Sequence, residues 1–399
     1  MQSLSTKQRK GFAKHQKNWF GKWHTYAGVI AGSILVIVCL TGTLLVFEQE
    51  LDVWLYPDLF EYEKGEQELT FQQLADRIEE QQPNWQLAGL FKDDLRKGVI
   101  LAILIDSEEQ VFASPYTGEI LGTRVYRKSV MGFTRHLHRT LLVPVVGRYI
   151  VGICALFMVI LVITGLRLWI PSKWKHLKSN LTIKRGASLK RQNYDFHQAV
   201  GFYFSPFLAL ISLTGVAITF SPLVILALFL VSFEPPQSLD SILNQQSTYE
   251  EGFKPINIDE AYAFAMEEEP EARISGISLP RDSAGIYTIN LYKDNAAQTG
   301  DRTLLFMDQY TGEVLTNSGT DFPNIGKAYV NWVTPIHFGT FGGLTTRILA
   351  LISSFMGAIM FLTGIIIWWP RYKKMKKNKP YLAKEKPLEE TEKEKTTTV

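Results

Sequence analysis

The apolar stretch WHTYAGVIAGSILVIVCLTGTLLVF, residues 23–47, decides the fold, because the chain contains its pattern a second time. From position 197 the sequence reads HQAVGFYFSPFLALISLTGVAITF. When the two stretches are superimposed, a histidine, a glycine one turn later and a threonine-glycine pair near the far end all coincide. The matched residues are His24 with His197, Gly28 with Gly201, and Thr41-Gly42 with Thr214-Gly215.

A second pair of apolar stretches repeats in the same way. Each contains a histidine, then an arginine, then another threonine-glycine pair. The matched residues are His138 with His337, Arg148 with Arg347, and Thr164-Gly165 with Thr363-Gly364. Four of the 7 histidines in the chain are therefore two repeated pairs.

Hydrophobic residues make up 46% of the 399 residues, and they gather in long windows, which is typical of a membrane protein. Each window is long enough to cross a hydrocarbon core of about 30 Å. The windows are 24–47, 149–170, 197–232 and 347–369. The first one resembles a secretory signal peptide, but it is too long and no cleavage site follows, so we interpret it as an uncleaved anchor.

Charge predicts the orientation of these spans. The segments 1–22, 171–196 and 371–379 are rich in Lys and Arg, whereas 48–134 and 233–330 are acidic. By the positive-inside rule, both termini and the middle loop are cytoplasmic and the two acidic segments are external. Basic runs beside membrane spans indicate topology and headgroup contacts, and we expect no nucleic-acid partner.

The chain has only two cysteines, Cys39 and Cys154, and both lie inside apolar stretches. Two buried thiols provide neither a disulfide framework nor a zinc site, so we interpret them as small core residues.

Each acidic segment has the pattern of a small α+β module. The first has a predicted helix at 70–82, with Thr70 as its N-cap, and strands at 99–105 and from 111. The second has a predicted helix at 258–269 and strands at 286–292 and 303–315. A Thr-Gly-Glu turn occurs at the same place in both, at 117–119 and 311–313.

The sequence therefore predicts an α-helical membrane protein with four transmembrane helices, built as two parallel repeats that each carry an external module. The predicted segments are a basic cytoplasmic arm (1–22), a first span (23–47), an external module (48–134), a second span with an outer extension (135–171), a basic cytoplasmic loop (172–196), a third span (197–232), a second external module (233–330), a fourth span with an outer extension (331–370) and a charged cytoplasmic tail (371–399).

The repeated histidines are the candidate site. A two-fold axis between the halves would bring His24 opposite His197 near the cytoplasmic surface, and His138 opposite His337 near the outer surface. Two imidazoles across a bundle are suitable axial ligands for a haem iron, which predicts two haem sites. The alternative is that each histidine bonds headgroups or backbone at the interface.

Neighbouring residues leave further alternatives open. Gly28 and Gly201 lie one turn beyond their histidines, where either a flat porphyrin or close helix packing would need a missing side chain. The Thr-Gly pairs either flank a haem or are packing notches. Arg148 and Arg347 either pair with haem propionates or reach the interface.

The less regular residues add two more possibilities. Arg139 has the same potential as Arg148, but its repeat partner is Phe338. His136 does not repeat and is either solvated, an alternative ligand or a proton carrier. No nucleotide-binding or nucleophile motif occurs in a convincing context, so we expect the electron donor to be another protein or a membrane quinol.

These motifs in this order resemble the PepSY-associated transmembrane family, which includes iron-regulated inner-membrane proteins and ferri-siderophore reductases. The resemblance covers about residues 12–375. It rests on the His138-Arg139-Thr-Leu-Leu segment followed by TGLRLWIP, the two HxxxG helix openings, the Pro-Ile-His337-Phe-Gly segment and two YTGE modules. It implies four membrane helices with two external PepSY modules.

In the reductase members, the family also implies b-type haems that carry electrons outward to ferric chelates, with the four repeated histidines as ligands. One departure is Gln198, because many relatives have a basic residue after this histidine. That departure concerns propionate contacts rather than ligation.

Our hypothesis from the sequence is a di-haem electron conduit in the cytoplasmic membrane that reduces a ferric siderophore or another iron chelate on the outer side. One alternative is a regulator of an external peptidase, and another is a transporter of a chelate or haem. Against transport, Arg167 and the histidines are almost the only ionisable residues of the spans, so a site for a coupling ion is hard to assign.

Overall fold

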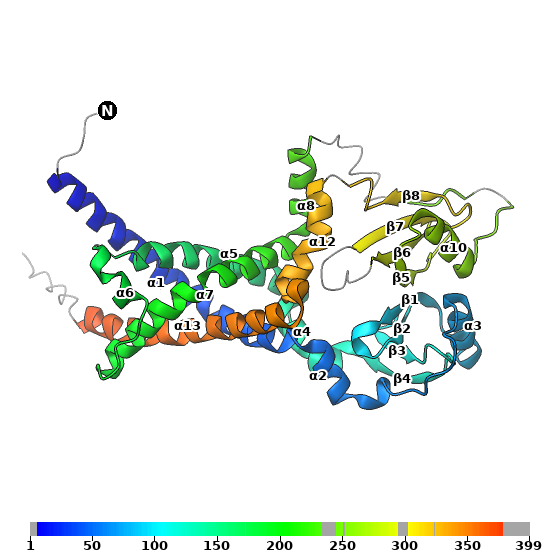
Figure 1. Cartoon of the computed structure of the whole chain (residues 1–399), viewed down its shortest axis with the longest axis horizontal. Helices are drawn as coiled ribbons and strands as arrows, with labels where there is room; N and C mark the ends of the chain where they lie inside the picture. The colour runs from blue at the N-terminus through cyan, green and yellow to red at the C-terminus, as the bar shows by residue number, and fades with distance from the viewer. Residues whose placement is uncertain are drawn as a thin grey trace, which may run out of the picture.

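The computed structural model places a long helical bundle at one end of the molecule and a β-sheet domain at the other (Figure 1). The predicted tail lies outside the described residues from position 378 on. The described residues are 6–171, 173–233, 245–249, 252–293, 302–322 and 324–377.

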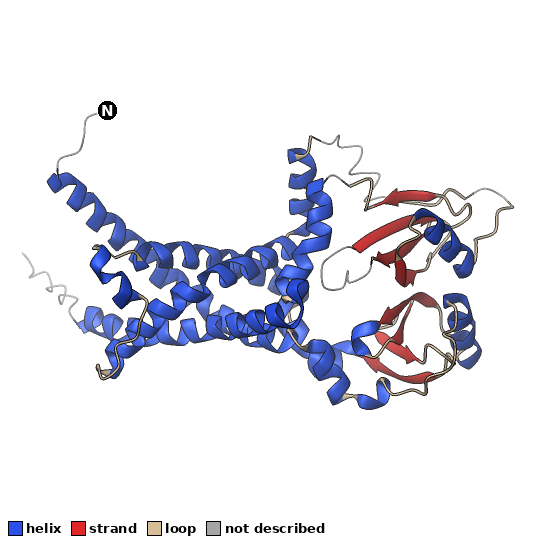
Figure 2. Cartoon of the chain, viewed as in Figure 1, coloured by secondary structure: helices blue, strands red, loops and turns tan. Residues whose placement is uncertain are grey.

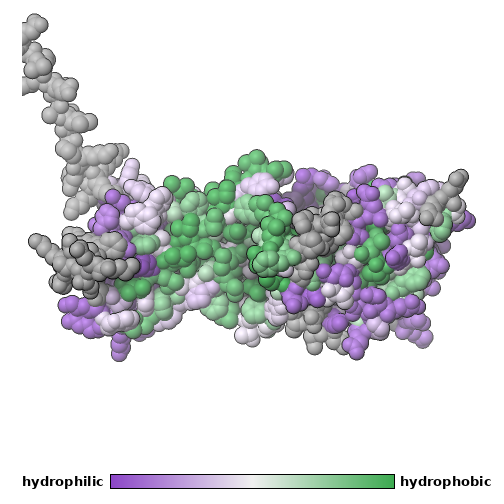
Figure 3. Space-filling model, turned by 90° about the horizontal axis from the view of Figure 1, so that it is seen from above, coloured by the Kyte–Doolittle hydropathy of each residue, from purple (hydrophilic) through white to green (hydrophobic). Residues whose placement is uncertain are grey.

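Among the residues that the structure describes, four helices are long and apolar enough to cross a membrane, which confirms the predicted number of spans. They are α1 (Thr6–Leu45), α5 (Pro144–Trp169), α7 (Leu189–Thr219) and α13 (Gly343–Lys377). Helices α1 and α7 each pack against both α5 and α13, so the four form one bundle. The surface of this bundle is hydrophobic on the face shown in Figure 3, whereas the sheet domain is mostly hydrophilic.

The third apolar stretch, predicted as one span over 197–232, is divided into two helices. Helix α7 ends at Thr219 and a separate helix, α8 (Ser221–Val231), begins after Phe220. Pro222 fits the first turn of a new helix because that position needs no amide donor.

Short helices carry the chain between the bundle and the sheet. On the first half, α4 (Val130–Thr140) precedes α5, and the turn between them holds Leu141 and Leu142 at positive φ. On the second half, α12 (Asn324–Phe338) precedes α13, and glycines occupy the positive-φ positions at 339 and 343. The other short elements are α2 (Glu48–Leu55), η1 (Pro57–Leu59), η2 (Asp94–Arg96), η3 (Tyr126–Lys128), η4 (Trp174–His176), α6 (Leu177–Asn180) and η5 (Thr340–Gly342).

In the described part of the chain, all eight strands belong to one antiparallel sheet, of order β4-β3-β2-β1-β5-β6-β7-β8 (Figure 2). The two predicted modules therefore share a sheet, because β1 pairs with β5 across the boundary between them. The strands are β1 (Leu87–Asp93), β2 (Val99–Leu104), β3 (Glu109–Ala113), β4 (Ile120–Val125), β5 (Arg273–Ser278), β6 (Ile286–Tyr292), β7 (Arg302–Asp308) and β8 (Val314–Asn317).

Two helices, α3 (Phe71–Gln81) and α10 (Ile258–Glu268), pack on the sheet and bury one continuous apolar core with it. Thr70 caps α3 as predicted, because its hydroxyl accepts the amide of Gln73 in a capping box. A second contact joins the helices directly, since the Thr70 hydroxyl also donates to Asp259 over 2.9 Å. The modules thus form one domain.

Candidate functional site

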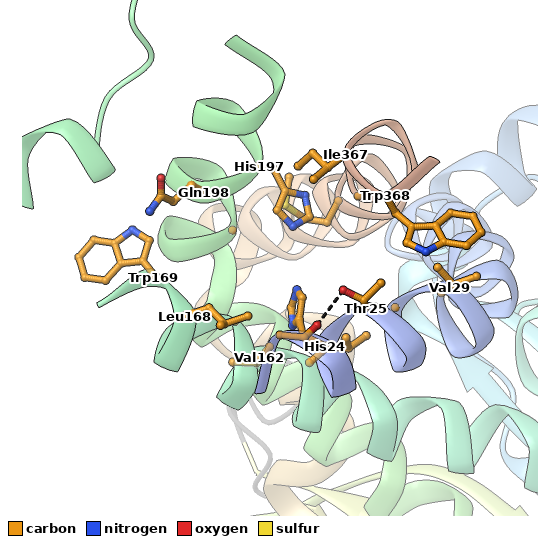
Figure 4. A pocket seen from close by; sticks show the side chains of 18 of the residues that line it. His24, Thr25, Val29, Val162, Leu168, Trp169, His197, Gln198, Ile367 and Trp368 are labelled. Atoms are coloured by element: carbon orange, nitrogen blue, oxygen red, sulfur yellow. Dashed lines mark hydrogen bonds between the residues drawn. The ribbon is translucent and has the colours of Figure 1, made fainter. Parts of the chain in front are cut away.

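The first predicted pair, His24 on α1 and His197 on α7, lies on opposite sides of one space inside the bundle (Figure 4). The ring centres are 6.4 Å apart and the ring planes are inclined by 80°. Both histidines line a cavity of about 820 Å³ whose walls come from all four spanning helices. A cavity of this size is within the range that holds a cofactor.

The second predicted pair, His138 on α4 and His337 on α12, lies toward the sheet domain. Its ring centres are 6.3 Å apart, with planes inclined by 56°. Each pair takes one histidine from each half of the chain. The structure therefore brings together the four histidines that the sequence comparison matched.

Every one of these histidines contacts the threonine of a Thr-Gly pair through its Nδ1 atom. The contacts are the same in the two halves of the chain, because each histidine and its repeat partner contact matching threonines. The Nδ1–Oγ1 distances are 2.9 Å for His24 and Thr164, 2.8 Å for His197 and Thr363, 3.2 Å for His138 and Thr41, and 3.0 Å for His337 and Thr214.

The direction of these hydrogen bonds follows from the threonines. Each threonine hydroxyl donates to a carbonyl of its own helix, as Thr164 does to Ile160 over 2.7 Å. With its hydrogen used, the oxygen accepts a bond from Nδ1–H of the histidine. We infer that Nδ1 carries the proton in all four rings. Nε2 is then left with the lone pair that a metal needs.

The glycine of each Thr-Gly pair makes room for the same ring. A Cβ atom at Gly165 would lie 3.2 Å from Cε1 of His24, and one at Gly42 would lie 3.0 Å from Cε1 of His138. The Thr-Gly pairs thus orient the histidines. Sequence reasoning marked these positions by their repetition but assigned them to haem flanking or helix packing, because it could not show which side chain each pair meets.

The glycines one turn beyond the inner histidines have a different environment. A Cβ atom at Gly28 would lie 3.6 Å from Leu161, and one at Gly201 would lie 3.5 Å from Met360, which are ordinary contacts. At Gly32 the same atom would come within 2.6 Å of Phe361. Helix packing therefore requires glycine at 32 but not at 28 or 201, both of which line the cavity.

The two repeated arginines have partners within the protein. Arg347 donates to the carbonyl of Val46 over 2.8 Å and forms an ion pair with Glu50. Arg148 donates to the carbonyl of Thr219 over 3.0 Å. Both guanidinium groups thus satisfy free carbonyls near the end of a spanning helix in the other half. The predicted contact with a propionate would have to compete with these bonds.

The other predicted candidates lie outside the two pairs. Arg139 is exposed and makes no hydrogen bond or ion pair with the described part of the chain. His136 is half-buried, and its ring forms no stacked or edge contact with either pair.

A buried group of charged residues connects the sheet domain to the helix that carries His138. The Glu48 carboxylate accepts bonds from Tyr126 and Arg135, and Arg135 lies one turn before His138 on α4. Asp52 is fully buried and takes a bidentate bond from Arg124, with both distances 2.6 Å. Glu48 and Asp52 follow the first span directly, and the sequence showed them only as part of an acidic segment.

Within the described ranges, no three or more His, Cys, Asp or Glu side chains form a cluster that could hold a bare metal ion. The histidine pairs offer two nitrogen ligands each, which is the donor set of a metal already held by a macrocycle.

Four candidate spanning helices, a sheet domain and two histidine pairs define a multi-pass membrane protein with histidines from its two halves paired side by side. The family model described as the PepSY-associated TM region matches residues 22–371, so the chain belongs to that family. No curated protein matches the chain.

Proposed function

We propose that this protein is a di-haem electron-transfer protein that reduces ferric chelates on the sheet side of the cytoplasmic membrane. The observation that carries the proposal is the pairing of histidines from the two halves, with each Nδ1 bonded to threonine and ring centres 6.4 and 6.3 Å apart.

The spacing suits an iron between the rings. A bond from a metal to an imidazole nitrogen is about 2 Å long, and that nitrogen lies about 1 Å from the ring centre. Two histidines on one iron therefore have ring centres about 6 Å apart, which is close to both separations. The glycines at 28 and 201 supply the second support, because they line a cavity that packing alone does not explain.

In this proposal, His24 and His197 hold one haem b and His138 and His337 hold the other. The four threonines fix the ring orientation and keep the coordinating nitrogen free of a proton. A bis-histidine haem supplies one-electron transfer without an open position for oxygen. The two pairs lie at different depths, since Thr41 is 17 residues beyond His24 on α1, or about 25 Å along the helix.

The proposed topology has two parallel repeats, with both termini cytoplasmic and the sheet domain external. The matched contacts of the two halves support the repeats, and the basic segments at the bundle end support the orientation. The inner pair would then accept electrons from the cytoplasmic side and the outer pair would deliver them outside.

A membrane quinol or a separate reductase is the proposed donor. One quinol gives two electrons and two protons on oxidation to the quinone, which balances the reduction of two Fe(III) to two Fe(II). Fe(II) is a softer ion than Fe(III) and is held less well by hard oxygen ligands. Reduction of a ferric siderophore would thus release its iron.

The test is a reduced-minus-oxidised absorption spectrum of the purified chain, with pairs of histidines changed separately. We expect a b-type spectrum with two haems per chain and loss of one haem in each of the variants His24→Ala/His197→Ala and His138→Ala/His337→Ala. His176→Ala, in the loop at the bundle end, should keep both. A chain without such a spectrum, or one that keeps it with all four ligands changed, would contradict the proposal.

Reductase activity needs a separate measurement. The reduced protein should be reoxidised by a ferric hydroxamate, with Fe(II) trapped by a coloured chelator in proportion. Haem that is present but is not reoxidised by any ferric chelate would leave electron transfer intact and exclude this substrate class.

A further inference from the structure

Helix α8 is too short and too differently directed to belong to the spanning set. Its eleven residues, Ser221–Val231, cover about 16 Å, roughly half of a hydrocarbon core. Figure 1 shows α8 almost perpendicular to the bundle, at the end of the spans that faces the sheet domain. A helix in this position lies parallel to the membrane plane.

The composition of α8 is unsuited to a helix whose outer side faces water. Its sequence, SPLVILALFLV, contains no charged residue. One side packs on the segment that leads into α12, where the rings of Phe229 and Phe322 are 6.3 Å apart. The remaining side is exposed and apolar over a full turn and more, at Leu223, Leu226, Leu230 and Val231.

The exposed face of α8 continues the lipid-facing surface of the bundle. Helix α7 exposes Leu213 one and a half turns before its end, and α8 begins directly after Phe220. Figures 1 and 3 share their horizontal direction, and the hydrophobic surface of the bundle in Figure 3 extends to the level of α8 in Figure 1. The lipid that surrounds the spanning helices therefore reaches α8 as well.

Among the described residues of the first half, no such helix follows the first span. At the matching position, directly after α1, lies α2, whose buried Glu48 and Asp52 form ion pairs with Arg135 of α4 and Arg124 of β4. The chain therefore continues differently after the first spanning helix of each half. In the first half α2 packs against protein, whereas in the second half α8 exposes an apolar surface that no described residue covers.

We propose that α8 is an in-plane membrane helix whose exposed face inserts among the acyl chains of the leaflet on the sheet side. Helices of this kind are held by the apolar area they bury at the boundary between headgroups and chains. Helix α8 packs against α12, which carries His337. This contact therefore holds His337, the member of the outer pair from the second half, at the membrane surface. The proposal does not depend on haem binding.

The test uses the full chain in phosphatidylcholine vesicles, with one added cysteine carrying an environment-sensitive fluorophore. The three variants are Leu226→Cys on α8, Ile163→Cys on the exposed face of α5, and Leu95→Cys on the surface of the sheet domain. Labelling of the unchanged chain gives the background from Cys39 and Cys154. Quenching is measured with nitroxide lipids whose spin label lies near the headgroup or deep in the chains.

We expect the probe at 226 to be quenched most by the shallow nitroxide, the probe at 163 most by the deep one, and the probe at 95 by neither. A probe at 226 that is quenched by neither nitroxide, like the probe at 95, would place α8 in water and overturn the proposal. Maximal quenching by the deep nitroxide at 226 would overturn the in-plane orientation. If the probe at 226 is not quenched by the lipids but quenches itself more as the labelled fraction rises, the exposed face of α8 binds a second copy of the chain and the proposal is overturned.

Discussion

Thr164 and His24, which are 140 residues apart in the chain, are joined by a 2.9 Å hydrogen bond between Oγ1 and Nδ1. This threonine is the hydrogen-bond partner of the ring, so we expect Thr164→Val to weaken haem binding at the inner pair about 10–100-fold. Thr164→Ser should restore most of the affinity. The measurement is a haem titration of the apoprotein, followed by absorption and by the midpoint potential of the inner haem.

Thr43→Val is the matched control for this prediction. Within the described ranges, its hydroxyl bonds only to the carbonyl of Cys39 on its own helix, over 2.8 Å. It should leave both haem affinities unchanged. An equal loss in the Thr43 and Thr164 variants would mean that helix stability, rather than orientation of the imidazole, is what the threonines provide.

The second prediction concerns the cavity. Gly28→Leu should block haem at the inner pair while the haem-free protein keeps its unfolding temperature, because the new side chain enters empty space. Gly32→Leu should instead destabilise the haem-free protein by about 1–3 kcal/mol, because its Cβ atom would collide with Phe361. The checks are haem content and thermal unfolding in detergent. Unchanged haem content in the Gly28 variant would contradict the cavity assignment.

The third prediction concerns the buried charges between α2 and the sheet. Asp52 is 0% exposed and Arg124 10%, so Asp52→Asn should cost about 3–5 kcal/mol by leaving a buried guanidinium without its charge partner. Glu108→Gln removes a pair in which both side chains are more than half exposed, and should cost less than about 1 kcal/mol. Denaturant unfolding of the sheet domain distinguishes the two. Equal effects would argue against a structural role of the buried group.

The fourth prediction concerns acid stability of the sheet. Burial alone would raise the pKa of Asp308, but bonds from the amides of Thr311, Tyr310 and Thr248 outweigh it and lower the pKa below its ordinary value. A carboxylate with a lowered pKa stabilises the fold above its ordinary pKa, and this contribution is lost as the pH falls through the lowered value. The turn at 311–313, in the second half of the sheet domain, should therefore become less stable in acid.

Ser114 is a built-in control for that experiment, because it accepts amides at the same turn of the first half through a neutral hydroxyl. Hydrogen exchange in peptides covering 302–317 should speed up in acid beyond the intrinsic trend, while peptides covering 109–125 should not. Asp308→Asn should remove the difference. A similar acceleration at both turns would show that Asp308 is not its cause.

The sequence was sufficient for the spans and for the histidine pairs. Apolar length alone decides whether a helix can cross a bilayer, and that property is visible without a structure. The pairing of His24 with His197 was predictable because internal repetition restricts which residues can face one another. Neither inference needed the path of the chain outside the bundle.

Strands β1 and β5 and the end of α7 were not predicted, for physical reasons. Strands β1 and β5 contain Gly89 and Gly276, which weaken any strand pattern, yet the pairing needs them. A Cβ atom at 276 would lie 2.2 Å from the ring of Phe91, and one at 89 would lie 2.8 Å from a carbonyl of β5. The end of α7 was missed because Ser221 and Pro222, which follow Phe220, lie inside an apolar run long enough to be taken as one span.

The pairing of β1 with β5 has a mechanical consequence for the whole molecule. The two halves of the chain are joined in the bundle, where α1 packs on α13 and α5 on α7, and again at the far end through the shared sheet. The protein is thus a closed frame, with the outer histidines between its two joints. A movement that widens the gap across that pair would therefore act on two contacts at once, the packing of the bundle and the pairing of β1 with β5.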